Sequence, residues 1–87
     1  MPIYMKKSIL DDLLSGLSDK NMRFSDLRKL VLNFGFVERT KGGHHVFSKT
    51  GIVEIINMQP GNDGKAKAYQ VKQVRGLVIK HKLHREE

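Results

Sequence analysis

The first apolar pattern in the chain lies near its start and has helical spacing. It consists of Ile9, Leu10, Leu13, Leu14 and Leu17. Ser8 precedes this pattern and Asp11 follows three positions later, a combination typical of a capping box at a helix N-terminus. We therefore predict a short helix that begins after Ser8 and ends near Gly16.

Two further segments have the same period. The second predicted helix has Ser25 as its N-cap and ends at Gly35. Its apolar stripe is formed by Leu27, Leu30, Val31 and Phe34. The third helix begins at Ala68, after a polar loop over residues 60–67. Its apolar side is formed by Val71, Val74, Leu77, Val78 and His81. Cations occupy the other sides, so this helix is amphipathic.

Between the second and third helices the apolar period changes to two, which is typical of strands. We predict strands over residues 36–40, 44–49 and 52–58, with turns over 41–43 and 50–51. Short turns join neighbouring strands, so the sheet should be an antiparallel meander. Two of the helices can cover one of its faces. The predicted fold class is therefore a two-layer α+β domain with an open sheet face and an extra N-terminal helix.

Length and composition set the class of protein. The chain has 87 residues, enough for a single domain with one small core. It has no cysteine, which excludes disulfides, cysteine zinc sites and thiol nucleophiles. Its uncharged stretches fall far short of the roughly 20 apolar residues of a membrane helix, and no signal-type segment follows Lys7. We expect a soluble cytoplasmic protein that does not associate with membranes.

The charge favours a polyanionic partner. The chain has 16 Lys and Arg against 9 Asp and Glu, for a net charge of +7. The segment Gly64–Arg85 holds seven basic residues and no acidic one. Such a segment is typical of proteins that bind a polyanion, although a cationic helix face that only keeps the protein in solution has the same composition.

Catalytic motifs are scarce, and the adjacent pair His44 and His45 is the main candidate. Consecutive side chains of a strand point to opposite faces, so the two histidines cannot share one metal ion, and no third ligand is evident. We predict that Val46 faces the core together with His44. His45 and Phe47 would then lie on the open face, where an RNA base could stack on the Phe47 ring. Alternatively, Phe47 covers the sheet or contacts a partner.

A family resemblance rests on the run from Phe34 to Phe47, FGFVERTKGGHHVF. It resembles the HicA toxin signature, in which a helix end and a Gly-Phe pair are followed by a strand and a K-G-S-H-H-x-F turn. Gln59-Pro60 and the segment Tyr69–Arg75 also resemble one branch of that family. The similarity extends from about Phe24 to Leu83, which divides the single domain 1–87 into an N-terminal helical extension, 1–22, and a HicA-like core, 24–83.

The resemblance implies a double-stranded-RNA-binding-like α-β-β-β-α core and a ribonuclease that cleaves mRNA and is neutralised by a HicB-type antitoxin. It implies no metal and no small-molecule cofactor. His45 matches the catalytic histidine of the family motif. Gly43 stands where the family has serine, whose hydroxyl could orient the histidine or the phosphate.

The expected chemistry is metal-independent. Neutral His45 would take the proton of a ribose 2′-hydroxyl, which attacks the adjacent phosphate. Lys41 and the backbone amides of Gly42–His44 would stabilise the charge that develops. Phosphate contacts are expected from Lys65, Lys67, Lys72 and Arg75. Two alternatives remain open: a non-catalytic RNA-binding module of the same fold, and a domain that only binds an acidic protein.

Overall fold

The structure is a computed structural model that describes residues 8–85. The elements are α1 (Ile9–Ser15), α2 (Phe24–Asn33), β1 (Val37–Lys41), β2 (His44–Lys49), β3 (Ile52–Met58), α3 (Ala68–Lys80) and a short 3₁₀ helix (Leu83–Arg85). The predicted α+β class and the antiparallel meander are confirmed, with strand order β1-β2-β3. Within this part of the chain, no helix is long and apolar enough to cross a membrane.

The ends of α1 agree with the sequence pattern. The Ser8 hydroxyl accepts a hydrogen bond from the Asp11 backbone amide at 3.0 Å, and the Asp11 carboxylate accepts one from the Ser8 amide at 3.4 Å. Gly16 ends the helix in the left-handed region, with φ 74°. The two orphan amides of the first turn are therefore satisfied reciprocally, which fixes where a helix of only two turns begins.

The start of α2 differs from the prediction. The N-cap is Arg23 rather than Ser25, and its side chain makes no capping hydrogen bond. Arg23 is extended because it forms an isolated antiparallel bridge with Lys65. The Phe24 amide donates to the carbonyl of Gly64 at 3.1 Å. A contact from the loop before α3 thus sets the boundary, and no local side-chain pattern could indicate it.

The β1–β2 hairpin closes through two residues instead of the predicted three, because Lys41 belongs to β1 and pairs with His44. Gly42 has φ 61°, the left-handed conformation that a two-residue turn of type II′ requires at its first position. The tight turn fixes the register, which places Thr40 opposite His45 and Glu38 opposite Phe47.

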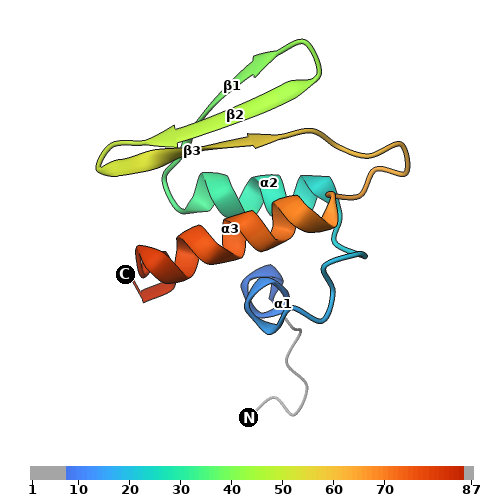
Figure 1. The fold of residues 1–87 in the computed structure, drawn as a ribbon, viewed down its shortest axis with the longest axis horizontal. Helices are drawn as coiled ribbons and strands as arrows, with labels where there is room; N and C mark the ends of the chain where they lie inside the picture. Colours follow the sequence, from blue (N-terminus) through green and yellow to red (C-terminus); the bar gives the residue numbers. More distant parts are fainter. Residues whose placement is uncertain (1–7, 86–87) are drawn as a thin grey trace.

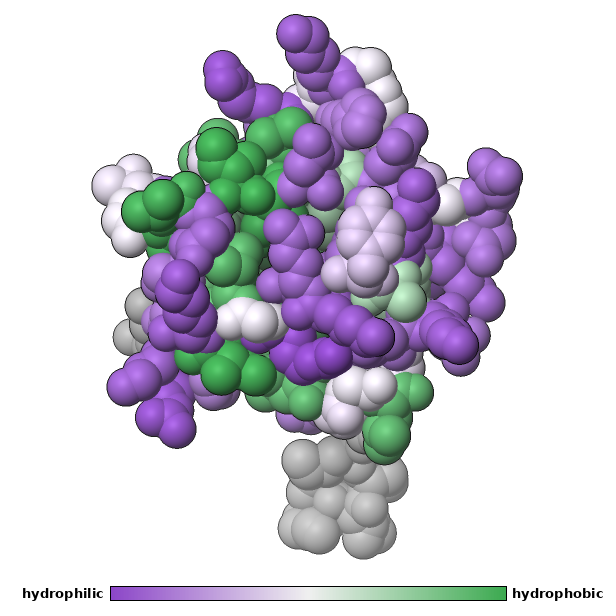
Figure 2. All heavy atoms as spheres, in the orientation of Figure 1, coloured by the Kyte–Doolittle hydropathy of each residue, from purple (hydrophilic) through white to green (hydrophobic). Residues whose placement is uncertain are grey.

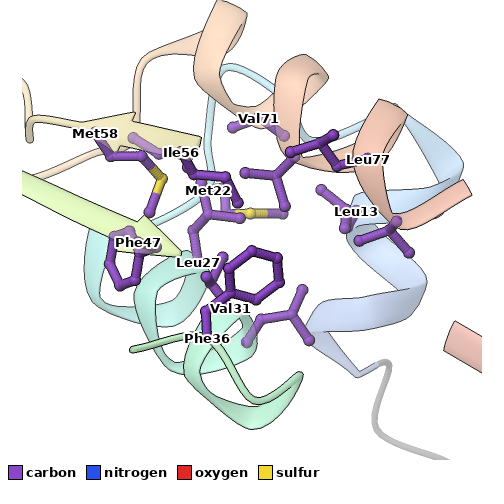
Figure 3. Close-up of a cluster of buried hydrophobic side chains, with 14 of the residues drawn as sticks. Leu13, Met22, Leu27, Val31, Phe36, Phe47, Ile56, Met58, Val71 and Leu77 are labelled. Atoms are coloured by element: carbon purple, nitrogen blue, oxygen red, sulfur yellow. The ribbon is translucent and has the colours of Figure 1, made fainter. Parts of the chain in front are cut away.

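The two layers are evident in Figure 1, where α2 and α3 lie along one side of the sheet. From the sheet, Phe47, Ile56 and Met58 enter the core at 0–1% exposure. They point toward buried side chains of both helices, among them Leu27 and Val71 (Figure 3). The buried side chains of the helices recur every third or fourth residue, and those of β3, Ile56 and Met58, are two residues apart, as the two periods require.

The N-terminal helix is part of this core. Leu13 of α1 is fully buried, and Arg75 of α3 donates a hydrogen bond to its carbonyl at 3.0 Å. The same guanidinium forms a two-bond ion pair with Asp19, at 2.9 and 3.1 Å. The Asp19 side chain is only 10% exposed. This ion pair therefore fastens the α1–α2 connection to α3.

We predict that Asp19→Ala destabilises the fold by about 2 kcal/mol, because it leaves the Arg75 guanidinium partly buried without its counter-ion. Urea unfolding followed by circular dichroism measures this difference. Lys20→Ala, at the exposed neighbouring position, should change the free energy of unfolding by less than about 0.5 kcal/mol. Equal effects of the two substitutions would contradict a structural role for the ion pair.

Candidate histidine site and nucleic-acid interface

The two histidines of β2 face opposite sides of the sheet, but the predicted assignment of sides is wrong. Phe47 is fully buried in the core, and His45, two residues away, faces the helices with it. His44 and Val46 lie on the open face. Both Val46 and Phe47 are apolar, so alternation alone could not decide between the two registers. The larger side chain has the larger gain from burial and takes the core position. Phe47 therefore cannot stack on an RNA base.

His45 has a defined environment at the edge of the core. Its Nδ1 lies 2.7 Å from Oε2 of Glu38, and its ring lies 4.8 Å from the Phe24 ring, centroid to centroid. About a quarter of its side chain is exposed. In the neutral ring, hydrogen bonding to a carboxylate requires the proton on Nδ1. Nε2 then carries the free lone pair, and it has no hydrogen-bond partner within residues 8–85.

Glu38 is held from the other side by Arg28 of α2. Nε and one terminal nitrogen of Arg28 donate to the two carboxylate oxygens at 2.8 and 2.6 Å. These hydrogen bonds lower the pKa of Glu38 to about 2; partial burial opposes the shift and the contact with His45 adds to it. Glu38 is thus ionised at neutral pH, and its hydrogen bonds to Arg28 and His45 fix its orientation.

Sequence reasoning missed Glu38 and Arg28, although part of the signal was present. Once a two-residue turn is assigned to Gly42-Gly43, Glu38 and His45 fall on the same face of adjacent strands. They are diagonal neighbours, because Glu38 pairs with Phe47, two residues beyond His45. The contribution of Arg28 depends on how α2 crosses the sheet, which no local pattern gives.

The supporting residues predicted around His45 are only partly brought together. Gly42 and Gly43 form the turn directly before the histidine pair. The side chains of Lys41 and His44 lie on the open face, where Nδ1 of His44 is 3.1 Å from Oδ1 of Asn57. Lys41 therefore does not face His45, and its predicted role beside the reacting phosphate is not supported by this geometry.

The four cations predicted to contact phosphate lie in two different places: Arg75 and Lys72 on α3, and Lys65 and Lys67 in the loop before it. Arg75 is engaged by Asp19, so this geometry does not support its predicted phosphate contact. Lys72 is exposed, but the hollow that it lines is formed by residues of the α1–α2 connection and does not include His45. Lys65 and Lys67 lie in the loop before α3. The backbone of Lys65 forms an isolated antiparallel β-bridge with that of Arg23.

A cationic end is formed near His45 by residues that the sequence did not connect. The N-caps of α2 and α3 are Arg23 and Lys67, and neither helix start has a side-chain cap. Arg23 precedes Phe24, the ring that touches His45. A hollow of about 410 Å³ is lined by Arg23, Ser25, Asp63, Gly64 and Lys65. The partial positive charge of two helix N-termini and these cations favours an anion at this end.

Residues 8–85 contain no cluster of three or more His, Asp or Glu side chains able to hold a metal ion. Comparison of the chain with protein-family models, with curated proteins and with solved structures gives no significant match. The assignment of function therefore depends on the geometry of this site.

The contact network of Glu38 predicts a pH dependence of stability. A carboxylate with a depressed pKa in the folded state stabilises the fold above its unfolded pKa, near 4.5, and this contribution is lost as the pH falls through about 2. The free-energy difference between the wild type and Glu38→Gln should therefore be largest at neutral pH and shrink below about pH 4. Urea unfolding at a series of pH values measures it. A difference that stays constant down to about pH 2 would contradict the ionised network.

Proposed function

We propose that this protein is a metal-independent endoribonuclease in which His45 is the general base. The observation that carries the proposal is the hydrogen bond between Glu38 and Nδ1 of His45, which leaves Nε2 as the free base in the neutral ring. A carboxylate-oriented imidazole beside a cationic surface is suited to removing a proton next to a phosphodiester.

In the proposed reaction, Nε2 of His45 takes the proton of a ribose 2′-hydroxyl. The 2′-oxygen forms a bond to the adjacent phosphorus, and the bond from phosphorus to the 5′-oxygen breaks. The products are a 2′,3′-cyclic phosphate and a 5′-hydroxyl, the leaving oxygen being protonated by water or by the imidazolium. Glu38 stabilises that imidazolium and keeps the ring oriented.

Phosphate binding is assigned to the cations on the same side of the sheet as His45. Arg23, Lys65 and Lys67 lie at the helix starts and in the loop before α3. With the backbone amides of Gly42–His44, they replace Lys41 as the groups that stabilise the developing charge. Such contacts position the RNA backbone and read little of its sequence.

The wider proposal is a HicA-type toxin with a double-stranded-RNA-binding-like core, acting on mRNA in the cytoplasm and neutralised by a HicB-type antitoxin. Its support is the K-G-G-H-H-x-F run at the β1–β2 turn, together with the α-β-β-β-α order of the core. A non-catalytic RNA-binding module is the second candidate. The observation in its favour is Gly43, which lacks the hydroxyl that the family motif has next to the histidines.

We predict that the purified protein cleaves a mixed RNA in EDTA and that His45→Ala abolishes cleavage, because it removes the general base. Glu38→Gln should lower the rate about 100-fold or more, since an amide no longer stabilises the imidazolium. Denaturing gels measure cleavage, and retained RNA binding by His45→Ala is the control. Cleavage by His45→Ala at the wild-type rate would remove His45 from the mechanism. RNA binding without cleavage by any variant would favour the second candidate.

Gly43→Ser tests whether the missing hydroxyl limits activity. Gly43 does not have a left-handed φ, and the added Cβ would lie 3.2 Å from Nε2 of Gln59, the movable end of a flexible side chain. We therefore predict a folded variant whose cleavage rate rises about tenfold, a modest gain for one hydrogen-bond donor at a reacting phosphate. Gly42→Ser is the matched control and should destabilise the hairpin, because φ 61° is unfavourable for serine. An unchanged rate in folded Gly43→Ser would show that the hydroxyl is not limiting.

A further inference from the structure

The face of the sheet turned away from α2 and α3 has no covering element within residues 8–85 (Figure 1). Three large aliphatic side chains are exposed on it: Val37 at 64%, Val53 at 92% and Ile55 at 57%. Figure 2 shows, in the orientation of Figure 1, that hydrophobic side chains reach the molecular surface between hydrophilic ones. Large aliphatic side chains exposed together on one face of a sheet are typical of surfaces that a protein partner covers. We call this surface the open face.

The charges on the open face have one sign. Its ionisable side chains on the three strands are Arg39, Lys41 and His44. The two strand carboxylates, Glu38 and Glu54, face the helix side and are neutralised there by cations. Arg39 and Lys41 have no ion-pair partner among the described residues. The open face therefore combines an aliphatic surface with unpaired positive charge.

Two hollows surround Val46 in the middle strand of this face. One of about 330 Å³ is lined by Arg39, Thr40, Lys41 and Val46. The other, of about 540 Å³, is lined by Lys41, Gly42, His44, Val46 and Asn57. Val46 and Lys41 belong to both. Each hollow therefore has an aliphatic floor beside a cation, which suits an apolar side chain with a carboxylate next to it.

We propose that the open face is a docking site for a protein segment that presents aliphatic side chains flanked by Asp or Glu. The aliphatic side chains cover Val46, Val53 and Ile55 and bury the apolar centre of the interface. The carboxylates pair with Arg39 and Lys41 at its rim, where charge complementarity speeds association and selects the partner.

The same observations disfavour the two other occupants. RNA interfaces are polar and use aromatic or guanidinium planes to stack bases, whereas Val46, Val53 and Ile55 are aliphatic and Arg39 alone carries a guanidinium among the open-face residues of the strands. A second copy of this chain would bring Arg39 and Lys41 near the same cations of a molecule that carries a net charge of +7. An acidic, aliphatic protein segment complements both the aliphatic side chains and the unpaired cations of this surface.

This docking site shares only the β1–β2 turn with the ribonuclease proposal, because Gly42 and His44 also line one of its hollows. His45 and its cationic surroundings lie on the helix side of the sheet, and the docking residues lie on the other side. The inference would hold for a protein without catalytic activity, and its test measures peptide binding and no RNA cleavage.

The test uses the full chain labelled with ¹⁵N and two capped synthetic peptides, one alternating Glu and Val and one alternating Glu and Ser. The Glu-Val peptide should shift amide resonances around Val46 and Val53, and the Glu-Ser peptide should bind about tenfold more weakly. Arg39→Glu and Val53→Glu should each weaken Glu-Val binding about tenfold, which is 1.4 kcal/mol. Lys72→Glu makes the same charge change as Arg39→Glu on exposed α3 surface and should leave this binding unchanged. Circular dichroism establishes that each variant is folded.

Several results would overturn the proposal. Absence of shifts with the Glu-Val peptide, or equal binding by the two peptides, would remove the aliphatic segment as occupant. Binding that Arg39→Glu and Lys72→Glu weaken equally would indicate a general charge effect. A dimer in sedimentation velocity that Val53→Glu dissociates would assign the face to a second copy. RNA-induced shifts at Val53 that Arg39→Glu removes would assign it to RNA.

Discussion

The burial of Phe47 between the sheet and α2 and α3 is the constraint on which the rest of the arrangement depends. Its ring is fully buried, paired across the sheet with Ile56. Because side chains alternate along a strand, this single choice assigns every residue of β2 to a face. His45 must then lie on the helix side and His44 on the open face. The burial of one side chain thus places His45 and Glu38 on the helix side of the sheet and leaves aliphatic side chains on the open face.

The same constraint explains the polar network at the edge of the core. Glu38 stands opposite Phe47 in β1, so its carboxylate is carried to the helix side together with the ring. A carboxylate that is only 12% exposed needs hydrogen-bond partners. Arg28 and His45 provide them. The imidazole is therefore oriented by the hydrogen bond that it makes to a carboxylate at the edge of the packed core.

Local patterns in the sequence were sufficient for the elements and their order. The capping box at Ser8 and the meander both agree with the structure, because each depends on neighbouring residues only. The predicted face of His45 and the predicted start of α2 were wrong, and the ion pair of Arg75 was not predicted. Each is decided by a partner distant in sequence: helix packing on Phe47, the bridge from Lys65 and the carboxylate of Asp19. The open face of the sheet was also predicted, but His45 and Phe47 were placed on it instead of His44 and Val46.

One peptide bond separates His44 from His45, and these neighbours project from opposite sides of a single layer. Molecules bound to the two sides of this strand would not need to compete for space. A tether attached on one side could hold the protein at a chosen location while the other side stays accessible. A substitution on one face of the sheet could therefore change binding on that face and leave binding on the other face unchanged.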